Sequence, residues 1–98
     1  MKKNTKEIIN KLEKELPFLK KKFDVKTIHL FGSYVRNEQT DKSDLDILVV
    51  FSKVPGLIKF LELENYLEDK LNVKIDLVMK NAIKPRLKKN IFSNIIDI

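Results

Sequence analysis

Three aspartates in two apolar segments are the residues whose type and spacing could do chemistry. Asp44 and Asp46 flank Leu45, and Asp46 interrupts an otherwise apolar run, Leu45 to Phe51. In a strand, side chains two positions apart lie on the same face, so both carboxylates would project together. Neighbouring carboxylates repel each other unless a positive charge lies between them. Because oxygen ligands without thiols or histidines suit Mg²⁺, the pair is a candidate metal platform.

The third aspartate, Asp76, lies inside a second apolar segment, Val73 to Met79. Burying a carboxylate there without a partner would be costly, and a role as a ligand beside the other two would explain it. Three carboxylates can hold two Mg²⁺ ions about 3.5–4 Å apart, which stabilises the attacking and leaving oxygens of an in-line phosphoryl displacement. The alternative is a structural aspartate that only makes hydrogen bonds within the fold.

A Gly32-Ser33 step follows an apolar segment and precedes a polar one, where a strand would turn into a helix. Glycine lets a phosphate approach the backbone closely, and the first N–H groups of a helix point at such an anion. Ser33 adds a hydroxyl donor, and Arg36, one helical turn further on, adds a planar fork of donors. A Gly-Ser step alone is usually only a turn. Its order and spacing with the three aspartates favour phosphoryl transfer.

Hydrophobic periodicity predicts the elements that must position these residues. A first amphipathic helix is capped by Asn4 or Thr5 and is ended or kinked by Pro17 near Leu16, with a second short turn at residues 18–23. The other expected elements are a strand at Thr27 to Phe31, a helical turn and loop at Tyr34 to Ser43, a buried central strand at Leu45 to Phe51, a helix at Leu57 to Leu71 stopped by Asn72, a strand at Val73 to Met79, and a last helix after Pro85 patterned by Leu87, Ile91, Ile95 and Ile98. This order predicts an α/β (α+β) fold with a small mixed β-sheet and helices packed on it.

Length and composition limit the number of domains, the kinds of metal site and the partners that the chain can have. The 98 residues predict a single domain, 1–98, and the absence of cysteine excludes disulfides and thiolate metal sites. No apolar run suits a signal peptide or a membrane span, which favours a cytoplasmic protein without a membrane partner. The net charge is +6, but the clusters Lys20 to Lys22 and Lys84 to Lys89 are not interleaved with aromatics. Nucleic acid is therefore not expected as a direct partner.

The stretch FGSYVRNEQTDKSDLDILV, from Phe31 to Val49, resembles the signature of the DNA polymerase beta nucleotidyltransferase superfamily. It is most similar to the minimal nucleotidyltransferase (MNT) family, whose later aspartate is matched by Asp76. Many members have Ala-Arg-Gly where this chain has Val35-Arg36-Asn37. Asparagine tolerates the left-handed conformation that glycine would supply, so this departure is expected to do little harm.

The resemblance implies a role for each matching position. Asp44 and Asp46 would bind both of two Mg²⁺ ions, and Asp76 would bind the catalytic one and help to activate the acceptor hydroxyl. Gly32 and Ser33 would hold the triphosphate of ATP. Arg36 and, on weaker grounds, Lys42 would contact its phosphates. Beside these, Tyr34 could line the nucleotide site or pack a helix, and His29 is expected on a strand surface.

The resemblance also implies a partner. The family commonly pairs with a small helical HEPN protein, a ribonuclease toxin, and acts as its antitoxin by transferring AMP to a tyrosine of the toxin. The chain is too short for the acceptor-binding domain that larger relatives carry, which agrees with an acceptor supplied by a partner. Two alternatives remain at this stage. One is an antitoxin that neutralises its partner by binding alone, and the other is nucleotidyl transfer to a small molecule or an RNA end.

Overall fold

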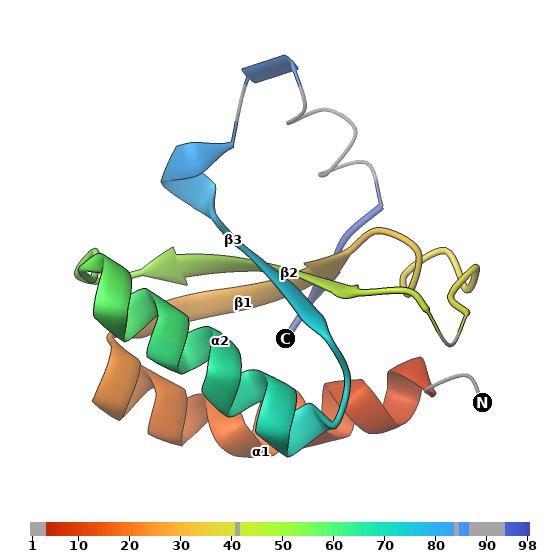
Figure 1. The fold of residues 1–98 in the computed structure, drawn as a ribbon, viewed down its shortest axis with the longest axis horizontal. Coiled ribbons are helices and arrows are strands. Elements are labelled where there is room, and N and C mark those ends of the chain that lie inside the picture. Colours follow the sequence, from red (N-terminus) through yellow and green to blue (C-terminus); the bar gives the residue numbers. More distant parts are fainter. Residues whose placement is uncertain (1–3, 41, 84, 87–93) are drawn as a thin grey trace.

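Two helices lie side by side against one face of a small mixed sheet (Figure 1). The structure is a computed structural model that describes residues 4–40, 42–83, 85–86 and 94–98. In chain order the elements are α1 (Thr5–Phe23), β1 (Val25–Phe31), β2 (Leu45–Phe51), α2 (Leu57–Leu71), β3 (Ile75–Met79), the 3-10 turn η1 (Lys80–Ala82) and β4 (Ile96–Asp97).

The sheet has the strand order β3-β2-β1-β4, which places β2 between two neighbours. Strand β2 runs parallel to β3 and antiparallel to β1, and β4 adds to the outer edge of β1 in an antiparallel sense. A parallel pair needs a crossover connection, and α2 supplies it between β2 and β3. The expected mixed sheet covered by helices is confirmed, and the apolar run of β2 is explained by its central position.

The two faces of the sheet have different environments, and this difference positions the acidic residues. Leu45, Ile47 and Val49 of β2 are buried in the main core cluster, which also contains apolar residues of both helices. Because side chains alternate along a strand, Asp46 projects to the opposite face, and so does Asp76 between the buried Ile75 and Leu77 of β3. The carboxylates therefore lie on the sheet face that carries no helix of this pair.

Helix α1 contradicts the expectation that Pro17 would end or kink the first helix, because it continues through Pro17 to Phe23. The Pro17 ring is exposed, so the backbone bond that proline cannot make is lost on the solvent side. Leu12, Leu19 and Phe23 are buried on either side of it, and their packing holds both halves of the helix on the sheet. Asn4 is the N-cap: its side chain accepts a hydrogen bond from the Lys6 N–H at 2.8 Å.

The bounds of α2 and β2 agree with the sequence prediction, and Asn72 ends α2 in the left-handed conformation at φ 53°. Strand β1 begins earlier than expected, at Val25, and β3 begins later, at Ile75. Lys74 still contributes to the sheet, because its carbonyl accepts the Leu45 N–H at 2.8 Å.

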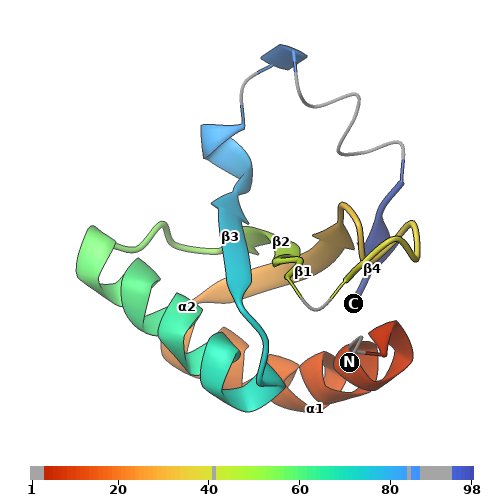
Figure 2. The same cartoon turned by 45° about the vertical axis from the view of Figure 1, so that its right-hand side comes forward.

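The end of the chain differs from the expected last helix. Pro85 and Arg86 are helical, residues 84 and 87–93 with the predicted helical Leu87 and Ile91 lie outside the described residues, and Ile96–Asp97 form β4. Figure 2 shows β4 beside β1. The strand is held by the Ile98 N–H, which donates to the Ile28 carbonyl at 3.0 Å, and by a side-chain pair. In that pair His29 Nδ1 lies 2.6 Å from Asp97 Oδ1. Ile95 and Ile98 of the expected helical pattern therefore lie outside any helix, because the residues between them pair with β1.

Among the helices of the described part of the chain, none has the length and apolarity needed to cross a bilayer.

Burial across the two faces of α2 predicts a difference in stability between two leucines of that helix. Leu67 is 0% exposed against the sheet, whereas Leu57 is 73% exposed. We expect Leu67→Ala to lower the free energy of unfolding by about 2–5 kcal/mol, because it leaves a cavity in the core. The matched control Leu57→Ala should change it by no more than about 0.5 kcal/mol. Urea denaturation of both variants measures the difference, and equal losses would contradict the assigned faces.

Candidate active site

The Asp46 carboxylate lies directly against the backbone of Gly32. Gly32 follows Phe31, the residue of β1 that is paired with Asp46. A Cβ built on Gly32 would overlap Oδ2 of Asp46 and would lie 2.9 Å from its Cγ. The φ of Gly32 is +81°, a conformation that side chains with a Cβ rarely adopt. The close approach and the positive φ both require glycine here, and they bring the Gly-Ser turn to the acidic pair.

The parallel register of β2 and β3 brings Asp46 and Asp76 together. The two residues are direct partners across the strands, and both project to the face opposite the helices. The negative charge of Asp76 raises the pKa of the Asp46 carboxyl group, as expected of two carboxylates that lie side by side. Asp76 is exposed and not buried as its apolar neighbours suggested. The reason is that β3 is an edge strand, whose outward face is open.

The charge of Asp46 is destabilised by its surroundings. Its pKa is raised from 3.8 to about 6, mainly by burial, then by the negative charge of Asp76 and their hydrogen bond, and then by Asp44. Arg36 acts in the opposite direction and lowers this pKa. The structure thus places all three aspartates and Arg36 in one electrostatic neighbourhood. Such a concentration of like charge around a perturbed carboxyl group is a common property of functional sites.

Asp44 follows a tight turn and directly precedes β2. Ser43 Oγ accepts the Thr40 N–H at 2.9 Å, and the Ser43 N–H donates to the Thr40 carbonyl at 3.1 Å. The Lys42 N–H donates to Thr40 Oγ1 at 3.3 Å, while the Lys42 side chain is exposed. No described contact ties Lys42 to the carboxylates, so its role in binding phosphates stays a prediction.

The segment after Gly32 is a hydrogen-bonded turn over residues 33–37 followed by a loop, which agrees with the short helical turn and loop that were expected. The Gly32 carbonyl accepts the N–H groups of Val35 at 3.1 Å and Arg36 at 3.3 Å, and the Ser33 carbonyl accepts the Glu38 N–H at 2.9 Å. Asn37 has φ 59°, which agrees with the left-handed conformation expected in place of glycine. The turn ends after this residue, and within it the charge of Arg36 acts on Asp46.

Two further residues named from the sequence are structural in this fold. Tyr34 is 2% exposed and belongs to the core, and its carbonyl accepts the Thr5 hydroxyl at 3.1 Å, so it anchors the turn to α1. His29 contacts Thr27 Oγ1 through Nε2 at 2.9 Å in addition to Asp97. Of the expected basic cluster near the end of the chain, Arg86 is exposed, and Lys84, Lys88 and Lys89 lie outside the described residues.

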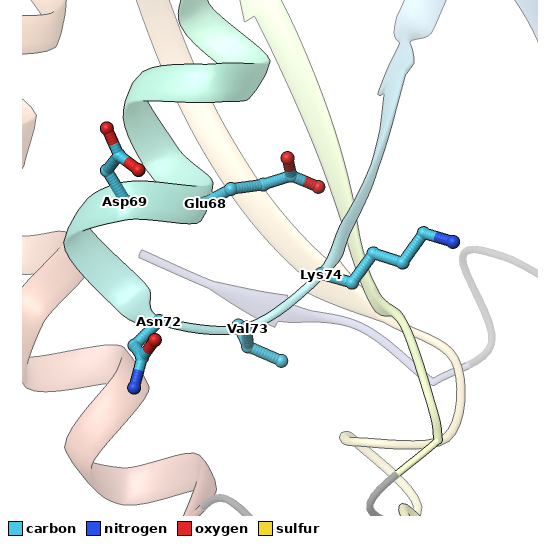
Figure 3. A pocket seen from close by; sticks show the side chains of 5 residues that line it. All are labelled: Glu68, Asp69, Asn72, Val73 and Lys74. Carbon is cyan, nitrogen blue, oxygen red and sulfur yellow. The ribbon is translucent and has the colours of Figure 1, made fainter.

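Sequence reasoning missed Lys74, which precedes Asp76 by two positions. It lies at the rim of a shallow pocket lined by Glu68, Asp69, Asn72, Val73 and Lys74 (Figure 3). The signal was present, because side chains two apart in a strand share a face. It was overlooked because Lys74 precedes the apolar core of the strand and resembles any other surface lysine.

The donor set fits Mg²⁺ in the form that proteins commonly use. In the described part of the chain, no three acidic or histidine side chains converge into a preformed metal cage. Mg²⁺ does not require one, because it is usually held by one or two carboxylates, water and substrate phosphates. Asp46 and Asp76 would supply oxygen ligands only, and a cation between them would relieve the repulsion that raises the pKa of Asp46.

Comparison with known proteins assigns the family. The nucleotidyltransferase domain family matches residues 7–98, nearly the whole chain. The chain belongs to this family. The nucleotidyltransferase is 54% identical over 93 residues to a Methanocaldococcus jannaschii protein provisionally named a protein adenylyltransferase, with 94% of this chain and 95% of that protein covered. It is 45% identical over 80 residues to protein adenylyltransferase MntA of Thermococcus cleftensis, with 82% and 81% covered.

Solved structures share the fold. A protein provisionally described as a minimal nucleotidyltransferase superposes with a TM-score of 0.83 at 27% identity, and 98% of this chain and 97% of that chain are covered. A toxin–antitoxin complex with AMP-PNP gives 0.70 at 27% identity, with 97% and 72% covered. The complex of a tri-AMPylated Shewanella oneidensis HEPN toxin with its MNT antitoxin gives 0.61 at 26% identity, with 96% and 67% covered. The resemblance to polymerase-beta-like minimal nucleotidyltransferases is confirmed.

The raised pKa of Asp46 predicts how stability depends on pH. The folded protein holds this proton more tightly than the unfolded chain, so the contribution is full below about pH 3.8 and is lost as pH rises through about 6. Asp46→Asn removes the ionisable group and can still donate a hydrogen bond to Asp76. In buffer with a chelator, we expect the variant to have a higher Tm than the wild type near pH 8 and a similar Tm near pH 4. A lower Tm of the variant than of the wild type near pH 8 would contradict this prediction, because the ionised Asp46 carboxylate would then not destabilise the fold.

The packing of Gly32 predicts a contrast between the two glycines of the chain. Gly32→Ala should lower the free energy of unfolding by about 1–3 kcal/mol, because of the positive φ and the overlap with Asp46. Gly56→Ala is the matched control, since a Cβ there meets nothing within 4 Å. In an Asp46→Ala background, Gly32→Ala should cost less, and a double-mutant cycle by urea denaturation measures that coupling. Strict additivity would rule out the contact.

Proposed function

We propose that this nucleotidyltransferase transfers AMP from ATP to a hydroxyl group of a protein acceptor, a tyrosine of a HEPN-type toxin, and thereby acts as an antitoxin. The observation that carries the proposal is the pairing of Asp46 and Asp76 in register, with Asp46 packed on Gly32. This arrangement would bring the turn that we propose for anion binding to the carboxylates that we propose for metal binding.

Each group has a part in the proposed reaction. Asp44, Asp46 and Asp76 would hold Mg²⁺, which supplies positive charge to the phosphates when it is bound. The backbone of Gly32, the Ser33 hydroxyl and Arg36 would hold the β- and γ-phosphates on the β1 side of Asp46. The acceptor oxygen bonds to the α-phosphorus as the bond to the β-phosphate oxygen breaks, and pyrophosphate leaves. Asp76, which is more exposed than its partner Asp46, would take the proton of the acceptor hydroxyl.

The relatives support the choice of nucleotide and acceptor. Two of the similar proteins are named protein adenylyltransferases. One similar structure contains AMP-PNP, an ATP analogue, and another contains an AMPylated HEPN toxin bound to an MNT antitoxin. The fold of this chain spans most of those similar chains, so the same reaction can be accommodated by the same elements. A HEPN-type partner is therefore the acceptor that we propose.

A labelling assay tests the proposal. The purified protein would be mixed with Mg²⁺, the helical protein encoded beside its gene, and each α-³²P-labelled nucleoside triphosphate in turn. We expect label on the partner from ATP, loss of label with a chelator, and a decrease on the order of 10²-fold or more for Asp44→Asn and Asp46→Asn. Asp69→Asn, which removes a carboxylate of α2 outside the site, is the matched control and should label normally.

Two outcomes would contradict the proposal. Full labelling by the purified Asp46→Asn variant would remove the carboxylates from the mechanism. A stable complex of the two proteins that accepts no label from any nucleotide would indicate neutralisation by binding alone.

A further inference from the structure

The backbone of Lys74 is fixed at the corner where β2, β3 and α2 meet. Its carbonyl accepts the Leu45 N–H at 2.8 Å, and the next N–H, that of Ile75, donates to Glu68 Oε2 at 3.0 Å. The first bond ties Lys74 to the start of β2, and the second ties β3 to the last turn of α2. The position from which the Lys74 side chain leaves the chain is therefore set by the fold.

The pairing of β2 with β3 brings the backbone of Lys74 close to the backbones of the three aspartates. Leu45 is paired with Ile75, so the preceding residues, Asp44 and Lys74, are neighbours across the two strands. Lys74 also precedes Asp76 by two positions, which puts both on the same face of β3. Figure 3 shows the Lys74 side chain leaving the strand on the side away from α2. Asp46 and Asp76 lie in β2 and β3, whereas Asp44 and Lys74 directly precede these strands, and Lys74 is the cationic residue of the four.

The Lys74 ammonium group remains available to a ligand. Its side chain is exposed, and it forms no ion pair with any of the described residues. The nearest acidic residue on α2, Glu68, already accepts the Ile75 N–H with its carboxylate. A lysine that directly precedes the strand of Asp76 and forms no ion pair with the described residues can neutralise a negative charge that arrives with the substrates.

The in-line geometry of the reaction indicates that this negative charge belongs to the acceptor. The Gly32-Ser33 turn follows β1, on one side of Asp46, whereas Asp76 lies in β3 and Lys74 directly precedes it, on the other side and at the edge of the sheet. In phosphoryl transfer the attacking and leaving oxygens lie roughly in line through the phosphorus. If pyrophosphate leaves over the β1 side, the acceptor oxygen must approach over β3.

We infer that Lys74 contacts the acceptor oxygen and stabilises the negative charge that develops on it during attack on the α-phosphorus. Lys74 keeps its own proton throughout, and the proton of the acceptor hydroxyl passes to Asp76. The new bond is between the acceptor oxygen and the α-phosphorus, and the bond that breaks releases pyrophosphate. The inference rests on the proposed adenylyl transfer, and it adds the side of the site from which the acceptor enters.

Kinetics of Lys74 variants test the inference on the labelled partner protein. We expect Lys74→Gln to lower kcat/KM for the acceptor on the order of 10²-fold, with Lys74→Arg recovering most of the loss because it restores the positive charge. Binding of AMPCPP, an ATP analogue that cannot release pyrophosphate, should be unchanged in calorimetry with Mg²⁺. The concentration of Mg²⁺ that gives half-maximal activity should not rise, because removing a cation beside the carboxylates cannot weaken their hold on a metal.

Matched controls separate this role from a general effect of charge or folding. Lys80→Gln makes the same change at the opposite end of β3 and should leave the kinetics unchanged, and all variants should keep the wild-type Tm within a few degrees. Wild-type transfer with an unchanged kcat/KM in Lys74→Gln would overturn this inference alone. Weaker AMPCPP binding in Lys74→Gln would also overturn it and would assign the lysine to the nucleotide side. Absence of transfer by the wild type would overturn the proposed function and, with it, this role.

Discussion

The contact between the Asp46 carboxylate and the backbone of Gly32 is the constraint on which the site depends. It fixes the Gly-Ser turn at the end of β1 against the acidic residue of β2, and the β2–β3 register then adds Asp76. Three segments that are far apart in the sequence are joined at one place by one close approach and one strand register. A side chain at residue 32 or a shift of one residue in β3 would separate them, because such a shift turns every side chain of the strand to the other face.

The cost of this arrangement is electrostatic. A partly buried carboxyl group beside two others has a raised pKa, so the folded protein is strained near neutral pH when no cation is bound. Stability alone would favour a neutral residue at position 46. Local strain of this kind is typical of sites whose charge is needed for binding or chemistry. The apolar side of the same strand, with Leu45, Ile47 and Val49 buried in the core, supplies the stability that allows it.

The sequence predicted the elements with strong periodicity and the residues that share a face. The bounds of β2 and α2 follow from local patterns alone. Pro17 was misjudged, because tertiary packing on both sides of it outweighs the loss of one hydrogen bond at the surface. Strand β4 was missed because two residues carry no period, and its pairing with β1 depends on contacts such as His29 with Asp97. The exposure of Asp76 and the position of Lys74 depend on strand order, which no local pattern contains.

The open edge of the sheet at β3 leaves the acidic site accessible from one side, which suits an acceptor presented by another protein. Everything proposed for the site requires the carboxylates to bind a divalent cation, and calorimetric titration of Mn²⁺, in the presence of AMPCPP, tests that requirement most directly. The wild type should bind Mn²⁺ near pH 7.5, and Asp46→Asn, which is folded and expected to be the more stable protein, should lose most of that affinity. Equal binding by both proteins would contradict the account, because it would mean that the paired aspartates are not the metal site.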